Sequence, residues 1–169
     1  TNVILALTRT KNPRLDYGHI RAALSEITGI PAESLESSDA LTPLLVRDAV
    51  ISIRRSKLPD VEQVGSAGSF FKNPVVDEEV FRKIQEANAD VPHYVTEGGV
   101  KIPAAWLIEQ CGWKGRTQGN AGVYEKQPLV IVNATGNASP GEIIDLKNDI
   151  TASVKERFGI TLEPEVEII

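Results

Sequence analysis

The sequence predicts an α+β fold, in which helices are layered on an antiparallel or mixed sheet. Short β-branched runs and amphipathic helical patterns are mixed along the chain without a steady β-α-β alternation. Glu97-Gly98-Gly99 stands between two apolar runs, which is typical of a β-hairpin. The chain has 169 residues, of which 41% are hydrophobic and 24% are charged. That composition is ordinary for a globular protein with a buried core.

Residues 1–40 are predicted to form a separate N-terminal part. Val3–Thr8 is apolar and β-branched, which predicts a strand. Asp16 can cap a short helix that runs to Ile27. Gly29–Ala40 is a connector rich in proline, serine and acidic residues. We therefore expect a domain boundary between residues 40 and 41.

The second part, residues 41–169, is predicted to begin with a helix. Thr42-Pro43 is a favourable helix start, and apolar positions continue along one face to Arg55. Lys57-Leu58-Pro59-Asp60 ends that helix and leads into a glycine-rich stretch. Asp77 then caps a short amphipathic helix.

A hairpin, a helix and two strands are expected next. Tyr94-Val95 and Val100–Ile102 are the two arms of the hairpin. A helix over 103–111 follows, with proline at its start and glycine directly after its end. Apolar runs at 123–124 and 129–132 predict two further strands.

The last helix and the last strand have clear boundaries in the sequence. Ser139 and Glu142 have the spacing of a capping box, and Gly159 marks the helix end. Leu162–Ile169 alternates apolar and acidic residues, which predicts a strand with one charged face. That face carries Glu163, Glu165 and Glu167.

Composition argues against several classes of partner. The net charge of −5 argues against nucleic acid and anionic membranes, which reward clustered cations. A single cysteine, Cys111, fits a reducing compartment, and no signal peptide or apolar run of about 20 residues is visible, so we expect a cytoplasmic protein. His19 and His93 lie too far apart for a metal-ligand pattern. The chain begins at Thr1 without any methionine, and we expect it to be a piece of a longer protein.

The stretch Gly65–Pro74, G-S-A-G-S-F-F-K-N-P, is the strongest candidate for a binding site. Its glycines permit close approach of the backbone to a ligand, and its phenylalanines can anchor the loop in a core. Ser69 can carry a proton, while Lys72 and Asn73 can hold a polar ligand. A serine that bonds nearby backbone, a solvated lysine and an asparagine in a turn explain the same residues without any function.

Other polar residues carry little signal alone. Lys57 can meet a phosphate as a point charge or simply be solvated, and Tyr17 and Gln127 are isolated polar residues in loops. Spacing does not distinguish Glu165 from the other acids of the terminal strand. The chain has no G-x-S-x-G elbow and no dinucleotide-binding G-x-G-x-x-G motif.

The glycine-rich stretch resembles the signature of the UDP-N-acetylenolpyruvoylglucosamine reductases (MurB), flavoenzymes of peptidoglycan precursor synthesis. Further segments resemble the type I branch of this family in the family's order, and together they cover essentially the whole chain. These segments are D-Y-G at Asp16, R-D-A-V at Arg47, K-L-P-D at Lys57, K-I-P-A-A-W-L-I-E-Q-C-G-W-K-G at 101–115 and L-E-P-E-V at Leu162.

The resemblance implies a reaction and roles for particular residues. In the family, NADPH reduces bound FAD, and hydride then passes to the enolpyruvyl double bond of UDP-N-acetylglucosamine enolpyruvate, which gives UDP-N-acetylmuramate. By this resemblance Ser69 would be the proton donor, and Glu165 would stabilise or protonate the enol form. The substrate-binding residues would be Tyr17, Lys57, Asn73, Gln127 and Lys114.

The resemblance also implies that the family's FAD-binding segments and a catalytic arginine lie outside this chain. Residues 1–40 would be a remnant strand of the flavin domain with a connector, and 41–169 the substrate-binding domain. We expect the chain alone to lack tight FAD binding and reductase activity, and to be a monomer that meets a small-molecule substrate. The alternatives are a non-catalytic module for a phosphorylated ligand or nucleotide sugar, and a plain interaction domain.

Overall fold

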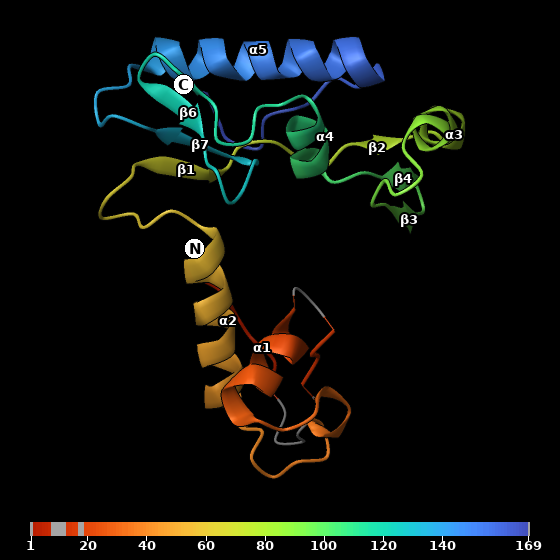
Figure 1. Ribbon diagram of the computed structural model, residues 1–169, viewed down its shortest axis with the longest axis vertical. Coiled ribbons are helices and arrows are strands. Elements are labelled where there is room, and N and C mark those ends of the chain that lie inside the picture. Colours follow the sequence, from red (N-terminus) through yellow and green to blue (C-terminus); the bar gives the residue numbers. More distant parts are fainter. Residues whose placement is uncertain (1, 8–12, 17–18, 169) are drawn as a thin grey trace. The chain divides into compact units, whose positions relative to one another are not determined.

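The computed structural model describes residues 2–7, 13–16 and 19–168 (Figure 1). The chain divides into two compact units, Thr1–Lys57 and Leu58–Ile169. This division lies later than the boundary expected after residue 40. The reason is the helix that follows the connector, whose buried residue Ala49 belongs to the core of the first unit.

The first unit is a small helical body. Helix α1 spans Ile20–Thr28 and α2 spans Pro43–Lys57, with a short 3₁₀ helix at Ala32–Ser34 between them. Gly29 ends α1 in the left-handed conformation, with φ of 69°. The core of the unit consists of Leu15, Leu24, Leu35, Leu41 and Ala49.

The strand expected at Val3–Thr8 is not formed where the structure describes it. Residues 2–7 have no regular secondary structure, and Thr8 lies outside the described residues. Val3 is 83% exposed and Ile4 is 93% exposed. A strand needs a neighbour that accepts its backbone hydrogen bonds, and no described strand pairs with this segment.

The second unit contains two antiparallel sheets. The four-stranded sheet has the order β1-β7-β6-β5, and the three-stranded sheet has the order β2-β4-β3. The strands of the first are β1 (Ser66–Ser69), β7 (Val130–Asn133), β6 (Ala121–Val123) and β5 (Thr117–Gln118). Those of the second are β2 (Val75–Val76), β4 (Gly99–Lys101) and β3 (Tyr94–Thr96).

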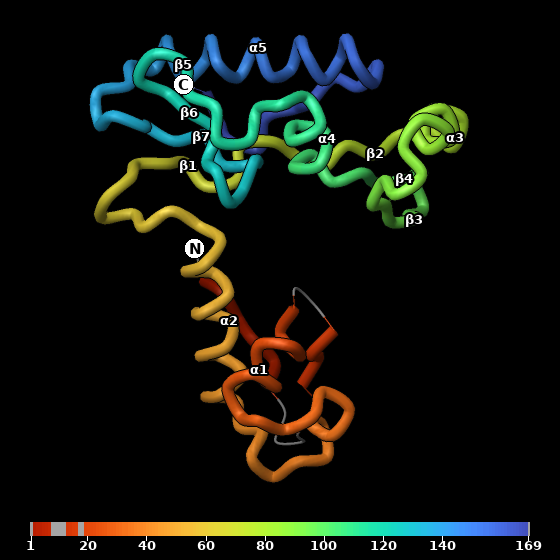
Figure 2. Tube along the Cα trace, in the orientation of Figure 1, coloured from red at the N-terminus to blue at the C-terminus, as the bar shows by residue number. Residues whose placement is uncertain are grey.

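Three helices complete the second unit: α3 (Glu78–Ala87), α4 (Ala104–Gln110) and α5 (Pro140–Phe158). Helix α5 runs along the four-stranded sheet, and α4 lies between the two sheets (Figure 2). Leu146, Ile150 and Val154 recur every four residues along α5 and join one core with α4 and both sheets. The α+β class with antiparallel sheets and layered helices is therefore confirmed.

Local signals in the sequence explain several element boundaries. The capping box forms as predicted, because the Glu142 backbone N–H donates to Ser139 Oγ at 3.3 Å and the Ser139 N–H donates to Glu142 Oε2 at 2.9 Å. Gly159 ends α5 with φ of 71°. The hairpin of β3 and β4 is also confirmed, with Val95 paired with Val100.

The strand expected over Leu162–Ile169 is wrong in part. Over its described residues, 162–168, this segment forms one isolated bridge, Phe71 with Pro164. The two backbone hydrogen bonds on either side of that bridge are its whole ladder in the described residues. The expected alternation holds, however: Leu162 is buried, whereas the acidic residues beside it are exposed.

Candidate functional site

The glycine-rich stretch forms a bulged strand where a loop was expected. Ser66 pairs with Val132 and Ser69 with Val130, so β1 contains one residue more than β7 over the same length. Gly68 lies inside this irregularity with φ of 78°. A bulge bends a strand and redirects its side chains. The sequence thus places Ser69 at the end of an edge strand that is bent just before it.

Two phenylalanines anchor the strand directly after Ser69, as the sequence predicts. Phe70 is 4% exposed and Phe71 is 1% exposed, and their ring centroids are 5.3 Å apart. The Phe70 N–H donates to the Leu129 carbonyl at 2.8 Å. Ser69 itself is exposed, and among the described residues its hydroxyl has no hydrogen-bond partner. The hydroxyl is therefore free to donate to a ligand.

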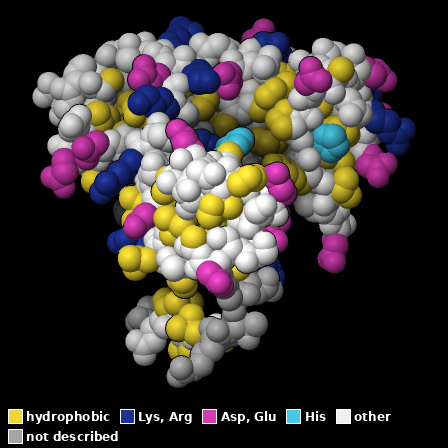
Figure 3. Space-filling view, turned by 60° about the horizontal axis from the view of Figure 1, so that its bottom comes forward, with side chains coloured by type: hydrophobic (Ala, Val, Ile, Leu, Met, Phe, Trp, Pro, Cys, Tyr) yellow, Lys and Arg dark blue, Asp and Glu magenta, His cyan; other side chains and the backbone are white. Residues whose placement is uncertain are grey.

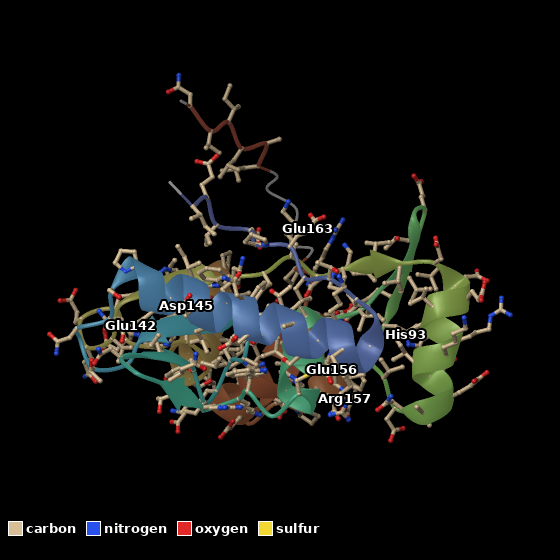
Figure 4. All side chains as sticks on the ribbon, turned by 90° about the horizontal axis from the view of Figure 1, so that it is seen from above. His93, Glu142, Asp145, Glu156, Arg157 and Glu163 are labelled. Atoms are coloured by element: carbon tan, nitrogen blue, oxygen red, sulfur yellow. The ribbon has the colours of Figure 1, made fainter. Side chains whose placement is uncertain are left out.

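Residues 163–165 of the C-terminal segment pair with residues 70–72, which include the two anchoring phenylalanines. The Lys72 N–H donates to the Glu163 carbonyl at 2.9 Å, and the Glu165 N–H donates to the Phe70 carbonyl at 2.8 Å. These two bonds flank the bridge of Phe71 with Pro164, so the missing N–H of Pro164 is not needed there. In Figure 4 the segment that carries Glu163 runs back from the end of α5. The pairing places Glu165 opposite the residue that follows Ser69.

The acids of this segment differ in their contacts, although their spacing is the same. Glu163 Oε2 lies 3.8 Å from Lys72 Nζ, and both side chains are more than half exposed. The Glu165 carboxylate has no ion pair or hydrogen bond within the described part of the chain. The Glu165 carboxylate is therefore available to a ligand.

Asn73 has an internal partner. Its Oδ1 accepts a hydrogen bond from the Ala104 N–H at 2.8 Å, which satisfies one free donor at the start of α4. The side-chain NH₂ group remains for a ligand. Asn73 therefore joins the segment that carries Ser69 to α4.

The other expected substrate residues are placed less favourably. Gln127 lies in the turn between β6 and β7, whose Leu129 carbonyl holds Phe70, so this turn adjoins the Ser69 segment. Lys114 lies after α4, and its Nζ is 2.7 Å from Glu109 Oε1. Lys57 is the last residue of α2 in the first compact unit and has no ion pair with any described residue. Tyr17 lies outside the described residues.

Hydrogen bonds between residues far apart in the sequence support the start of β1. The Asn133 N–H donates to the Gly65 carbonyl at 2.9 Å, and Asn133 Oδ1 accepts from Ala138 N–H at 2.8 Å. Glu142 accepts from the Asn120 backbone N–H at 3.1 Å and from Asn120 Nδ2 at 2.9 Å. The capping spacing predicts the contact of Glu142 with Ser139, but Asn120 is too distant in the sequence for any local pattern to find it.

The same contacts lower the pKa of Glu142 to about 2. The largest cause is the backbone N–H of Ser139, followed by the backbone N–H of Asn120 and the Ser139 hydroxyl. These donors favour the ionised carboxylate. The charge of Glu142 therefore ties the β5–β6 turn to the beginning of α5.

Two surface hollows lie away from Ser69. One, of about 470 Å³, separates α3 from the end of α5. The other, of about 360 Å³, is bordered by exposed side chains of α2. Neither is lined by Ser69, Asn73 or Glu165.

Charged side chains of both signs are mixed on the face shown in Figure 3, without a large patch of one sign on that face. Within the described residues, no group of three or more His, Cys, Asp and Glu side chains could hold a metal ion. No helix in the described part of the chain is long and apolar enough to cross a bilayer.

Comparisons with known proteins give a consistent result. The sequence model of the family described as "UDP-N-acetylenolpyruvoylglucosamine reductase, C-terminal domain" matches residues 59–169. The curated UDP-N-acetylenolpyruvoylglucosamine reductase of Bacteroides fragilis is 41% identical over 170 residues, covering 100% of this chain and 48% of the relative. The reductase of Xanthomonas oryzae is 47% identical over 158 residues, covering 92% and 42%. That of Porphyromonas gingivalis is 50% identical over 134 residues, covering 78% and 39%. The chain thus spans about half the length of the curated relatives it matches.

Proposed function

The chain belongs to the UDP-N-acetylenolpyruvoylglucosamine reductase family, and we propose that it is the C-terminal, substrate-binding part of such a reductase. The whole enzyme would convert UDP-N-acetylglucosamine enolpyruvate to UDP-N-acetylmuramate in peptidoglycan precursor synthesis. The hydrogen bond from the Glu165 N–H to the Phe70 carbonyl is the observation that supports the proposal, because it joins the segment that carries Glu165 to the residue directly after Ser69.

FAD and NADPH belong to the whole enzyme in this proposal. FAD, once reduced by NADPH, would supply the hydride for the enolpyruvyl double bond. Neither hollow described above is lined by Ser69 or Glu165, and by the family resemblance the FAD-binding segments lie outside this chain. We therefore expect the 169-residue chain alone to bind FAD weakly and to lack reductase activity.

Ser69 would deliver the proton that completes the reduction. Hydride addition next to a carboxylate leaves an enol or carbanion on the substrate, which is far more basic than an ordinary acceptor. A hydroxyl can therefore act as the acid if it is placed within hydrogen-bond reach of that carbon. This role is supported by the exposed position of Ser69 and by the two buried phenylalanines after it, which anchor its strand.

Glu165 would act on the same form of the substrate. A protonated carboxyl can donate to the developing enolate, and an ionised one can orient the proton donor. The short backbone pairing with Phe70 holds the residue near Ser69. Glu163 is less suited to this role, because Lys72 already lies beside its carboxylate.

The remaining residues would hold the nucleotide sugar. Lys57 would meet the diphosphate as a point charge, and Tyr17 would close over the nucleotide. The free NH₂ group of Asn73 and the amide of Gln127, in the turn beside Phe70, would add polar contacts. Lys114 would be a weaker contact, because it is already engaged with Glu109.

A reconstituted enzyme tests the proton donor. The chain would be joined to the flavin-binding half of a family reductase, and NADPH oxidation would be measured with the enolpyruvyl substrate. Ser69→Ala should lower kcat by about 10²- to 10⁴-fold, the usual contribution of a general acid. Ser66→Ala, on the same exposed strand, is the matched control and should leave kcat nearly unchanged. A loss of only a few-fold for Ser69→Ala would contradict the assignment.

Titration of the isolated chain with UDP tests the binding role separately. Weak saturable binding that falls with Lys57→Ala would support a nucleotide-sugar site. Binding that is the same for UDP and uridine would show that the diphosphate is not recognised. Complete absence of UDP binding would favour a plain interaction domain.

A further inference from the structure

The acidic residues of the C-terminal segment are compatible with more than one pairing register. Glu163, Glu165 and Glu167 occur at every second position, so a shift of two residues along the partner segment would keep every acid on the exposed face. Among the described residues, one isolated bridge, its two backbone hydrogen bonds and buried Leu162 set the register of this segment. Contacts between side chains then decide which acid stays free for a ligand.

Lys72 is the cation that pairs with one of these acids. It stands across from Glu163, with which it makes both a backbone hydrogen bond of 2.9 Å and an ion pair of 3.8 Å. Glu165 is two residues further along the same exposed face, at the diagonal position that a long side chain can reach. If the ion pair with Glu163 were lost, the Lys72 ammonium could therefore pair with the Glu165 carboxylate.

We propose that Glu163 is a positioning residue, which holds Lys72 in an ion pair and thereby keeps the Glu165 carboxylate free beside Ser69. Glu163 would neutralise Lys72, and Glu165 would remain available for the substrate. Buried Leu162 and the bridge of Pro164 with Phe71 set the starting register. The inference deepens the proposed function and rests on its assignment of Glu165.

The NMR signals of the Glu165 carboxyl and the Lys72 ammonium report directly on this role. The full 169-residue chain would be studied at pH 7 with both groups labelled, in the natural sequence and in Glu163→Gln. Without Glu163, Lys72 should turn to Glu165, so both signals should move from their natural positions. The double variant Lys72→Gln/Glu163→Gln should return the Glu165 signal to its natural position, apart from the small effect of losing the neighbouring charge.

Two further variants serve as controls. Lys72→Gln alone should leave the Glu165 carboxyl signal nearly unchanged, and a large change would show that Lys72 already contacts Glu165 in the natural chain. Glu79→Gln is the matched control, because Glu79 is an exposed glutamate ion-paired at 2.8 Å with Lys83 on α3. It should not affect the Glu165 signal. An unchanged Glu165 signal in folded Glu163→Gln would overturn the inference.

The reconstituted reductase gives an independent readout. Glu163→Gln should lower kcat severalfold while the KM for the nucleotide sugar changes little, and the double variant with Lys72→Gln should recover most of the lost turnover. A loss that the double variant does not recover would show that Glu163 acts otherwise. If Ser69→Ala leaves turnover intact, the proposed function fails, whereas the NMR measurements still decide the pairing of Lys72.

Discussion

The backbone N–H of Glu165 donates to the carbonyl of Phe70 at 2.8 Å. This bond joins the C-terminal segment to the strand that carries Ser69, although the two segments are far apart in the sequence. Phe70 is buried, so its carbonyl is a fixed acceptor. The position of the Glu165 backbone relative to Ser69 is therefore determined by the core of the second unit.

Gly68 should be intolerant of a side chain. Its φ of 78° is unfavourable for any residue with a Cβ, although nothing lies within 4 Å of the added atom. Gly68→Ala should therefore lower the free energy of unfolding by about 1 kcal/mol through backbone strain alone. Urea denaturation measures this. Gly141→Ala, where the glycine lies in α5 without a positive φ, should instead be neutral or slightly stabilising; equal effects at both positions would contradict the strain argument.

Asn73 should contribute to stability through its acceptor oxygen. Asn73→Ala removes the partner of the Ala104 N–H and should cost about 1 kcal/mol in urea denaturation, as loss of a helix cap does. Asn73→Asp keeps an oxygen in the same place and should restore most of this loss. If the aspartate variant is as unstable as the alanine variant, the hydrogen bond to Ala104 is not the cause.

Glu142 should make stability depend on pH in the acid range. Its folded pKa of about 2 lies below the ordinary value of 4.5, so its stabilising effect is fully present above about pH 5 and is lost as the pH falls towards 2. Glu142→Gln should therefore destabilise the chain at pH 7, and the difference from the natural sequence should shrink between pH 5 and pH 2. Urea midpoints across this range measure it. Glu156→Gln, at the other end of α5, is the control; a difference for Glu142→Gln that stays constant with pH would exclude a role for its charge.

Cys111 should react slowly with thiol reagents in the folded chain. Burial raises the pKa of its thiol, which outweighs the opposing effects of Ser153 and Arg157. The thiolate is the reactive form, so labelling with Ellman's reagent at pH 8 should be slow in buffer and should become rapid in denaturing urea. Equal rates in the two conditions would show that the folded structure does not protect the thiol.

Much of the second unit could be predicted from the sequence, because its signals are local. The capping box at Ser139 and Glu142, the glycine at the end of α5 and the hairpin turn each act within a few residues. The strand expected near the N-terminus was wrong in the described residues, because strand formation depends on a partner that local patterns cannot reveal. The bulge at Gly68 was missed for the same reason, since it exists only relative to β7.

The candidate site was predictable only in part. The sequence indicated Ser69 through its glycine-rich surroundings, but Glu165 was distinguished from its neighbours only by resemblance to a family. The physical difference between Glu163 and Glu165 lies in the contact with Lys72, which is remote in the sequence. The structural role of Asn73 was not predicted either: its side-chain oxygen accepts a hydrogen bond from the distant Ala104 N–H.

The late position of the C-terminal segment in the sequence has a consequence for biosynthesis. Leu162, Pro164 and Glu165 are translated after every helix and strand of the second unit. A nascent chain that has emerged only as far as Gly159 contains the residues of those strands and helices but lacks core residues Ile160 and Leu162 and has no carboxylate opposite Phe70. Synthesis of the last ten residues therefore completes both the core and the proposed proton-transfer pair.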